Sequence, residues 1–192
     1  MEPIVNRWSP YRFEPKPVED GDLLRCLEAA RWAASSFNDQ PWSWIVARRQ
    51  DETEFQKLLE CLLEANQQWA RSAGALLLTV TRTSFAYNGK PNRVALHDLG
   101  QAAAHLALQA TQLGLQVHQM AGINLSLARH QYSIPDSHQP QTAIAIGYPD
   151  LRPPQDEGSR ALNDRQSGPR RRYSLSEQVF SGKWGDPARF LS

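Results

Sequence analysis

The longest helical segment predicted in this chain constrains its fold more than any other feature. It runs from about Leu96 to Leu113, is rich in alanine and leucine, and is followed by Gly114, a residue suited to ending a helix. Apolar, β-branched or aromatic segments predict strands at 42–48, 75–80, 115–120 and 142–147. Shorter helices are expected at 20–34, 55–63 and 125–131. A helix this long and alanine-rich does not suit a regular series of crossover units, so we predict an α+β fold with helices around one small sheet.

The C-terminal fifth of the chain has a different character. We expect one domain over residues 1–192, with a core over about 1–150 and an extended arm and C-terminal tail over 151–192. Residues 152–174 are rich in Pro, Arg, Ser and Asp and lack an apolar period, so alone they cannot offset the entropy lost on ordering. Apolar residues then return at Leu175, Val179, Phe180 and Trp184. This tail is therefore expected to pack onto the core or onto a partner chain.

Charge and composition limit the classes of ligand. The chain has 21 lysine and arginine residues against 20 acidic residues, a formal net charge of +1. It therefore has no overall excess of positive charge that would attract nucleic acid or an anionic membrane. Small molecules are the expected ligands. Cys26 and Cys61 lie in apolar, helix-like stretches, which favours buried free thiols and agrees with a reducing cytoplasm. Because no stretch has the length and character of a membrane span or a secretory leader, we expect neither.

Two groups of arginines are candidates for phosphate binding. Arg7 and Arg12 flank Ser9 near the N-terminus, and residues 170–172 form a basic run near the C-terminus. A guanidinium donates two charge-assisted hydrogen bonds in one plane, which suits phosphate oxygens. Taken alone, the first group is better explained as a solvated N-terminal arm, and a run such as the second is usually a solvated surface. The net charge near zero favours a phosphate monoester over a polyanion for the second group.

A third cluster follows the first predicted helix and lies between Trp32 and Trp42. Its polar residues Ser35, Ser36 and Asn38 are able to satisfy loose helix carbonyls and loop amides. The same residues between two tryptophans also resemble a wall for a planar polar ligand. The residues by themselves leave both interpretations open.

Common catalytic signatures are missing from the sequence. The five histidines show no zinc-type pairing, so each is interpreted as structural and no metal is proposed. The sequence also lacks a Gly-x-Ser-x-Gly elbow, a phosphate loop ending in Gly-Lys-Ser/Thr, and a Gly-x-Gly-x-x-Gly turn. Acyl transfer, nucleotide hydrolysis and a Rossmann site therefore lack their usual motifs.

Taken in chain order, the clusters resemble the FMN-dependent nitroreductase family. The most specific match is residues 28–42, EAARWAASSFNDQPW, which is similar to the family pattern EAARWAPSSxNxQPW. Shorter matches follow in the same order at Arg7-x-Ser9, Asn66, Asp98-x-Gly100, Leu113-Gly114-Leu115, Met120-Ala121-Gly122, residues 143–149 and Arg170-x-Arg172. The resemblance extends over most of the chain, from Arg7 to about Gly185.

The resemblance implies a nitroreductase-like α+β fold with a mixed or antiparallel sheet and a C-terminal tail that packs on the partner of an obligate homodimer. It implies FMN at the subunit interface as cofactor and NAD(P)H as electron donor. Hydride would pass to flavin N5, and a small flat acceptor such as a nitroaromatic or a quinone would then be reduced in a ping-pong cycle. Because the flavin carries the chemistry, no catalytic side chain is expected.

The resemblance also implies roles for individual residues. The FMN phosphate and ribityl chain would be held by Arg7, Ser9, Arg170 and Arg172. The flavin of the partner subunit would be reached by Ser35, Ser36 and Asn38. The pyrimidine edge of the ring would meet Asn66, and the region of N5 would meet backbone groups of Met120, Ala121 and Gly122.

Two departures from the family pattern affect this site. Tyr11 stands where many members have Arg or Lys, and the nearest positive charge along the chain is Arg12, which leaves open whether Arg12 replaces it. Ala121 stands where Glu is frequent, so that only a backbone N–H remains there. The alternative function, from another class, is an FMN-binding sensor or carrier without turnover. A flavin-free structural dimer is a third interpretation.

Overall fold

A four-stranded sheet forms the centre of the computed structural model, which describes residues 1–191. Its strands are β1 (Trp42–Arg48), β2 (Ala75–Arg82), β3 (Gln116–Met120) and β4 (His138–Gly147). They lie in the order β1-β2-β4-β3, and all three neighbouring pairs are antiparallel. The sheet expected as mixed or antiparallel is therefore antiparallel.

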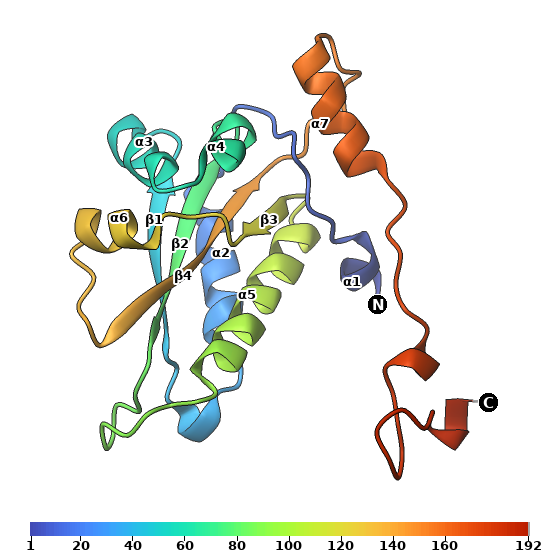
Figure 1. Ribbon diagram of the computed structural model, residues 1–192. Coiled ribbons are helices and arrows are strands. Elements are labelled where there is room, and N and C mark those ends of the chain that lie inside the picture. Colours follow the sequence, from blue (N-terminus) through green and yellow to red (C-terminus); the bar gives the residue numbers. More distant parts are fainter. Residues whose placement is uncertain (192) are drawn as a thin grey trace.

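The described residues form seven α-helices (Figure 1). Their bounds are α1 (Glu2–Asn6), α2 (Asp20–Arg31), α3 (Glu52–Glu60), α4 (Glu64–Ala70), α5 (Ala95–Gln112), α6 (Leu125–Gln131) and α7 (Glu157–Ser167). The long helix predicted from alanine and leucine is α5, and Gly114 follows it with a φ of 76°, a conformation that glycine adopts without strain. The predicted α+β class is confirmed.

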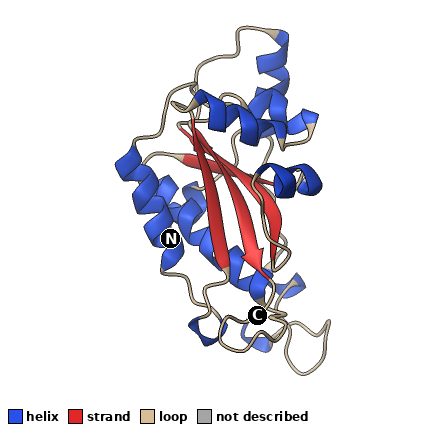
Figure 2. Cartoon of the chain, turned by 90° about the vertical axis from the view of Figure 1, so that its left-hand side faces the viewer, coloured by secondary structure: helices blue, strands red, loops and turns tan. Residues whose placement is uncertain are grey.

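The central strand β2 is buried on both faces, which explains its continuous apolar run. On one face, Leu77 packs with residues of α2 and α5, among them the fully buried Ala30 and Leu106. On the other face, Leu76 and Leu78 pack with α3 and α4. Figure 2 shows helices on both sides of the sheet. Two apolar layers therefore hold the sheet between them.

Several predicted boundaries differ from the structure. The first helix ends at Arg31, before the predicted residue 34. The helix expected over 55–63 ends at Glu60, because the chain turns there and Leu62 forms a bridge with Ile123. Strand β4 begins at His138, before the predicted residue 142. Pro140 made a strand at this position unexpected, because proline has no N–H to donate to the ladder. It is tolerated since it pairs with Val80 next to an irregularity in the register.

The arm, defined here as residues 151–191, contains a helix that the sequence did not predict. Its stretch 152–174 was expected to lack regular structure, but α7 lies within it. Asp156 and Ser159 form a capping box that starts this helix. None of its residues is buried, so the helix has no apolar stripe from which the sequence could reveal it.

Beyond α7 the arm runs away from the rest of the chain (Figure 1). Its large apolar side chains are exposed to solvent, with Leu175 at 63%, Phe190 at 79% and Trp184 at 92% of their full exposure. They make no contact with the body, defined here as residues 1–150, that would bury them. Of the two expected packing modes for the tail, packing back onto the core of the same chain is therefore wrong for these residues.

No helix among residues 1–191 is both long and apolar enough to cross a membrane. The two cysteines are free and buried, as predicted. Burial raises the pKa of Cys26 to about 12, so this thiol stays protonated at neutral pH.

Candidate functional site

The N-terminal segment that carries Arg7 and Ser9 is fixed against strand β3. Gln116 accepts a hydrogen bond from the N–H of Trp8 at 3.0 Å. His118 Nδ1 lies 2.9 Å from the carbonyl oxygen of Pro10, and because a carbonyl can only accept, Nδ1 carries the hydrogen and donates. Both side chains project from β3, so the segment is held across the edge of the sheet.

The structure brings Arg7, Ser9 and Arg170 together although they are far apart in sequence. Arg7 Nη1 donates to Ser9 Oγ at 3.2 Å. Arg170 reaches back from the arm and donates through Nη1 to the carbonyl of Arg7 at 2.7 Å and through Nη2 to that of Val5 at 2.8 Å. Arg170 therefore also has a structural role that the sequence did not indicate, because it ties the arm to the N-terminal segment.

Arg172 lies near the same group. Burial, followed by the positive charges of Arg170 and Arg172, lowers the pKa of the Arg7 guanidinium from its ordinary value. Within residues 1–191, no carboxylate forms an ion pair with any of these three arginines. Three cations gathered without a counter-charge make a favourable place for a multiply charged anion.

Arg12 does not belong to this cluster. Its buried guanidinium forms an ion pair with Asp150 at 3.1 Å and donates to Asn163 Oδ1 at 3.4 Å. Hydrogen bonding from Arg152, together with the charges of Arg12 and Arg152, lowers the pKa of Asp150 to about 2. Arg12 is therefore occupied and does not replace a cation at Tyr11. The guanidinium that lies on Tyr11 is that of Arg165, on α7.

A second part of the site joins α4 to the turn after β3. Asn66 Nδ2 donates to the carbonyl oxygen of Gly122 at 3.0 Å, and the N–H of Leu63 donates to the same oxygen at 2.9 Å. A Cβ atom at position 122 would lie 2.5 Å from Asn66 Nδ2, so only glycine allows this approach. The side chain of Asn66 is thereby fixed with its oxygen free of any partner in the described chain.

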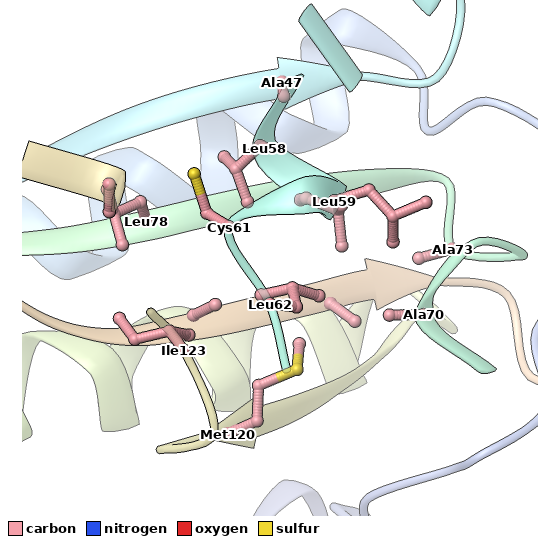
Figure 3. Close-up of a cluster of buried hydrophobic side chains, with 14 of the residues drawn as sticks. Ala47, Leu58, Leu59, Cys61, Leu62, Ala70, Ala73, Leu78, Met120 and Ile123 are labelled. Atoms are coloured by element: carbon pink, nitrogen blue, oxygen red, sulfur yellow. The ribbon is translucent and has the colours of Figure 1, made fainter. Parts of the chain in front are cut away.

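The turn itself presents backbone donors. Met120 ends β3, and its side chain points into the buried cluster below Leu62 (Figure 3). The N–H groups of Ala121 and Gly122 have no acceptor among residues 1–191. The roles predicted for Met120–Gly122 rest on the backbone, and the buried side chain of Met120 agrees with that restriction.

An aromatic group connects the two parts. The ring of Tyr11 meets those of Trp69 and His118 edge-on, with centroids 5.3 Å and 4.6 Å apart, and the rings of Trp69 and His118 lie 4.4 Å apart. His118 and Met120 are two residues apart on β3 and so lie on the same face of the sheet. Burial is the main cause of the lowered pKa of His118, which keeps the imidazole neutral at pH 7.

From the sequence alone, His118 is interpreted as structural, and neither Trp69 nor Arg165 stands out. Alternation along β3 was the available signal for His118, since it places this residue on the face of Met120. Nothing in the local sequence could indicate Arg165, because it depends on where α7 packs.

The third cluster, Ser35 to Asn38, is separate from the other two in this chain. Ser35 Oγ accepts from the N–H of Gln40 at 3.0 Å, and the N–H of Ser36 donates to the buried carboxylate of Asp98 at 3.1 Å. Asn38 adopts a φ of 54° and accepts from the Gln40 amide at 3.1 Å. No hydrogen bond, ion pair or ring contact among residues 1–191 joins these residues to the arginines or to Asn66.

The described geometry therefore consists of an anion-binding arginine group, a fixed amide with free backbone donors, and a separate polar turn. The sequence matches the model of the nitroreductase family over residues 4–148. The chain belongs to the nitroreductase family. This assignment confirms the resemblance drawn from residues 28–42 and the other motifs.

Several proteins and one solved structure are similar to this nitroreductase-family chain. An uncharacterized 15.4 kDa protein of Mycolicibacterium smegmatis is 32% identical over 153 residues, which cover 75% of this chain and 98% of that protein. The major NAD(P)H-flavin oxidoreductase of Aliivibrio fischeri is 46% identical, over 44 residues that cover 22% of this chain and 20% of that protein. A crystal structure described as an oxidoreductase containing FMN superposes with a TM-score of 0.86 at 31% identity, and covers 97% of this chain and 93% of that one.

Proposed function

We propose that this chain is an FMN-dependent NAD(P)H oxidoreductase that reduces a small flat acceptor by a ping-pong mechanism. The observation that carries the proposal is the gathering of Arg7, Arg170 and Arg172 without a carboxylate partner in the described chain. A phosphate monoester is the anion that such a group suits best. The flavin-oxidoreductase name of one relative and the FMN of a similar structure support the choice of FMN.

The residues present fit FMN at both ends. At the phosphate end, Arg7, Ser9, Arg170 and Arg172 supply charge and donors. At the ring end, the free oxygen of Asn66 suits an N–H of the pyrimidine edge, and the N–H groups of Ala121 and Gly122 suit acceptors of the ring. Because Gly122 has no Cβ, the Asn66 amide is able to occupy this position.

Bound FMN supplies the hydride-accepting chemistry, and the protein binds and orients it. Asn66 is held by Gly122 and so presents its oxygen in one direction. The neutral His118 and the rings around it fill the space beneath the N-terminal segment without adding charge. This division of labour needs no acid–base pair among the side chains of the site.

A homodimer completes the proposal. The polar turn at Ser35, Ser36 and Asn38 is remote from the arginines of its own chain, which is consistent with contact to the flavin of a partner subunit. The exposed Leu175 and Trp184 of the arm are suited to cover a partner chain. We propose that residues 1–192 act as one FMN-binding unit, with a core over about 1–150 and an arm over 151–192, in the cytoplasm.

The experiment is a fluorescence titration of FMN against the wild-type protein and the double variant Arg170→Ala/Arg172→Ala. Loss of two charge-assisted contacts, each worth about 1.5–3 kcal/mol, should weaken FMN binding at least about a hundredfold. A double variant that replaces Arg25 and Arg31 on α2 removes the same charge and should bind FMN like the wild type. Equal affinity of the two double variants would contradict the assignment of the arm to the phosphate.

A further inference from the structure

Three aromatic side chains form an exposed group, the aromatic platform, which consists of Phe37, Phe85 and Tyr87. The ring centroids of Phe37 lie 5.7 Å from Phe85 and 5.6 Å from Tyr87, and those of Phe85 and Tyr87 lie 5.5 Å apart. Phe37 is 77% exposed and Tyr87 is 62% exposed. Large apolar side chains that are exposed side by side in this way often mark a surface that binds a ligand or a partner.

Two segments that are far apart in the sequence carry the platform. Phe37 lies in the polar turn that precedes β1, and Phe85 and Tyr87 lie in the loop that follows β2. Figure 1 shows both segments at the same end of the sheet, where β1 begins and β2 ends. The loop folds back on itself as a hairpin, because the N–H of Phe85 donates to the carbonyl of Lys90 at 2.8 Å and the N–H of Gly89 donates to that of Phe85 at 2.9 Å.

A buried carboxylate fixes the hairpin against the polar turn. The side chain of Asp39 is 2% exposed, and its oxygens accept from the N–H of Ala86 at 2.8 Å and from Arg82 Nη2 at 2.8 Å. Arg82 Nε also donates to the carbonyl of Ser84 at 3.0 Å. Ala86 lies between the two aromatic residues of the hairpin. The rings are therefore held together before any ligand arrives, which lowers the entropy that a ligand must overcome on binding.

The backbone of the polar turn is strained where it presents Phe37. The φ angles of Phe37, Asn38 and Gln40 are 55°, 54° and 47°. Residues other than glycine seldom adopt positive φ, and a bulky aromatic residue does so least readily. Strain of this kind persists only where the surrounding structure enforces it, and it is common at binding sites. Here it accompanies a large apolar ring that is turned toward solvent and adds little to the core.

We propose that the aromatic platform binds the flat face of the electron acceptor and favours acceptors with fused rings. This inference rests on the proposed function, in which Ser35, Ser36 and Asn38 contact the flavin of a partner subunit. Phe37 lies between Ser36 and Asn38, so the platform borders that flavin in the proposed dimer. Aromatic rings associate favourably with other flat rings, either offset or edge-on. A fused-ring acceptor is wide enough to contact more than one ring of the platform, whereas a compact acceptor without a ring gains nothing from it.

The test uses the double variant Phe37→Asn/Tyr87→Ser, in which asparagine tolerates the positive φ of the turn. Steady-state kinetics of the FMN-loaded protein compare 2-methyl-1,4-naphthoquinone with ferricyanide, an acceptor without a ring. The variant should raise the KM for the naphthoquinone about tenfold relative to the KM for ferricyanide, because two ring contacts are lost. Saturation-transfer NMR should show a similar weakening for 2-naphthol, which is flat and is not reduced by flavin. Phe190→Ser removes an equally exposed ring from the arm and should change neither quantity.

Further variants separate this role of the rings from others. Tyr87→Phe keeps the ring and should retain most of the affinity for the naphthoquinone, and Tyr87→Ser alone should give a smaller change of the same sign as the double variant. Equal changes in KM for both acceptors, or unchanged binding of 2-naphthol, would overturn the proposal. A double variant whose dimer dissociates at higher protein concentration would assign the rings to the subunit interface and would also overturn it. If the wild type binds no FMN, the proposed function itself fails, whereas the titration with 2-naphthol still decides whether the rings form a binding surface.

Discussion

The body and the arm of this chain are stabilised by different forces. In the body, both faces of the sheet are covered by fully buried apolar side chains such as Leu77, Leu106 and Ile144. In the arm, Ala188 is the one buried residue among those described, and α7 is attached to the body by hydrogen bonds, charges and the partly buried side chain of Leu162. The body has a hydrophobic core of its own, and the arm does not.

This difference matters because the candidate site uses both regions. The body provides Asn66, the backbone of Ala121 and Gly122, and Arg7, and the arm provides Arg170 and Arg172. The end of the site at Asn66 is thus fixed by the core, whereas the arginine group also depends on the docking of a weakly held segment. Changes in the body should alter folding, and changes in the arm should alter ligand and partner binding.

The largest effect is expected from a core substitution. Leu106→Ala removes a fully buried side chain between α5 and the sheet and should lower the free energy of unfolding by about 3–5 kcal/mol. Leu151→Ala in the arm is the matched control and should change it by less than about 0.5 kcal/mol, because its side chain is 78% exposed. Urea unfolding of both variants measures the difference. Similar losses in the two would show that the arm shares the core of the body.

A smaller effect is expected where the two regions meet, at Asp150. Asp150→Asn leaves the buried Arg12 without its counter-charge and should cost about 3 kcal/mol at pH 7. The pKa of Asp150 in the folded protein is about 2, below its value in the unfolded chain, so its stabilisation is complete above about pH 4 and is lost as the pH falls toward 2. Unfolding curves of wild type and variant should therefore converge in acid. Asp156→Asn is the control. Asparagine is also a good N-cap for α7, so this variant should unfold like the wild type both at pH 7 and near pH 2.

The body half of the site is tested by Gly122→Ala. The added Cβ would meet Asn66 Nδ2 at 2.5 Å and should displace that amide, which weakens FMN binding about tenfold, or about 1.4 kcal/mol. Gly21→Ala is the control, because nothing lies within 4 Å of the added atom. Calorimetric titration with FMN compares the two. An affinity in Gly122→Ala equal to that of the control would remove Asn66 from the site.

The smallest effect on folding is expected at the end of the arm. Trp184→Ala should leave the unfolding free energy of the body within about 0.5 kcal/mol of the wild type, because the side chain is 92% exposed. If the arm covers a partner, the same variant should dissociate at higher protein concentration in analytical ultracentrifugation. An unchanged dimer would exclude Trp184 from the interface.

The sequence predicts the elements of the body better than those of the arm. The apolar period of α5 and the apolar run of β2 predict elements of the body because their burial determines which residues they contain. Helix α7 was missed because its docking through Gln166 and Asn163 leaves no apolar pattern. Arg12 was open as a phosphate ligand until its pairing with Asp150, 138 positions away, showed that it is occupied. Local sequence carries no information on such a contact.

Whether this nitroreductase-family chain is an NAD(P)H oxidoreductase is measured by anaerobic absorption spectroscopy of the FMN-loaded protein. We expect NADH or NADPH to abolish the visible absorption of the bound flavin, and a quinone or a nitroaromatic compound then to restore it. A protein that binds FMN but keeps its colour with both nucleotides would disprove the proposed reductase activity and would indicate a flavin-binding sensor or carrier.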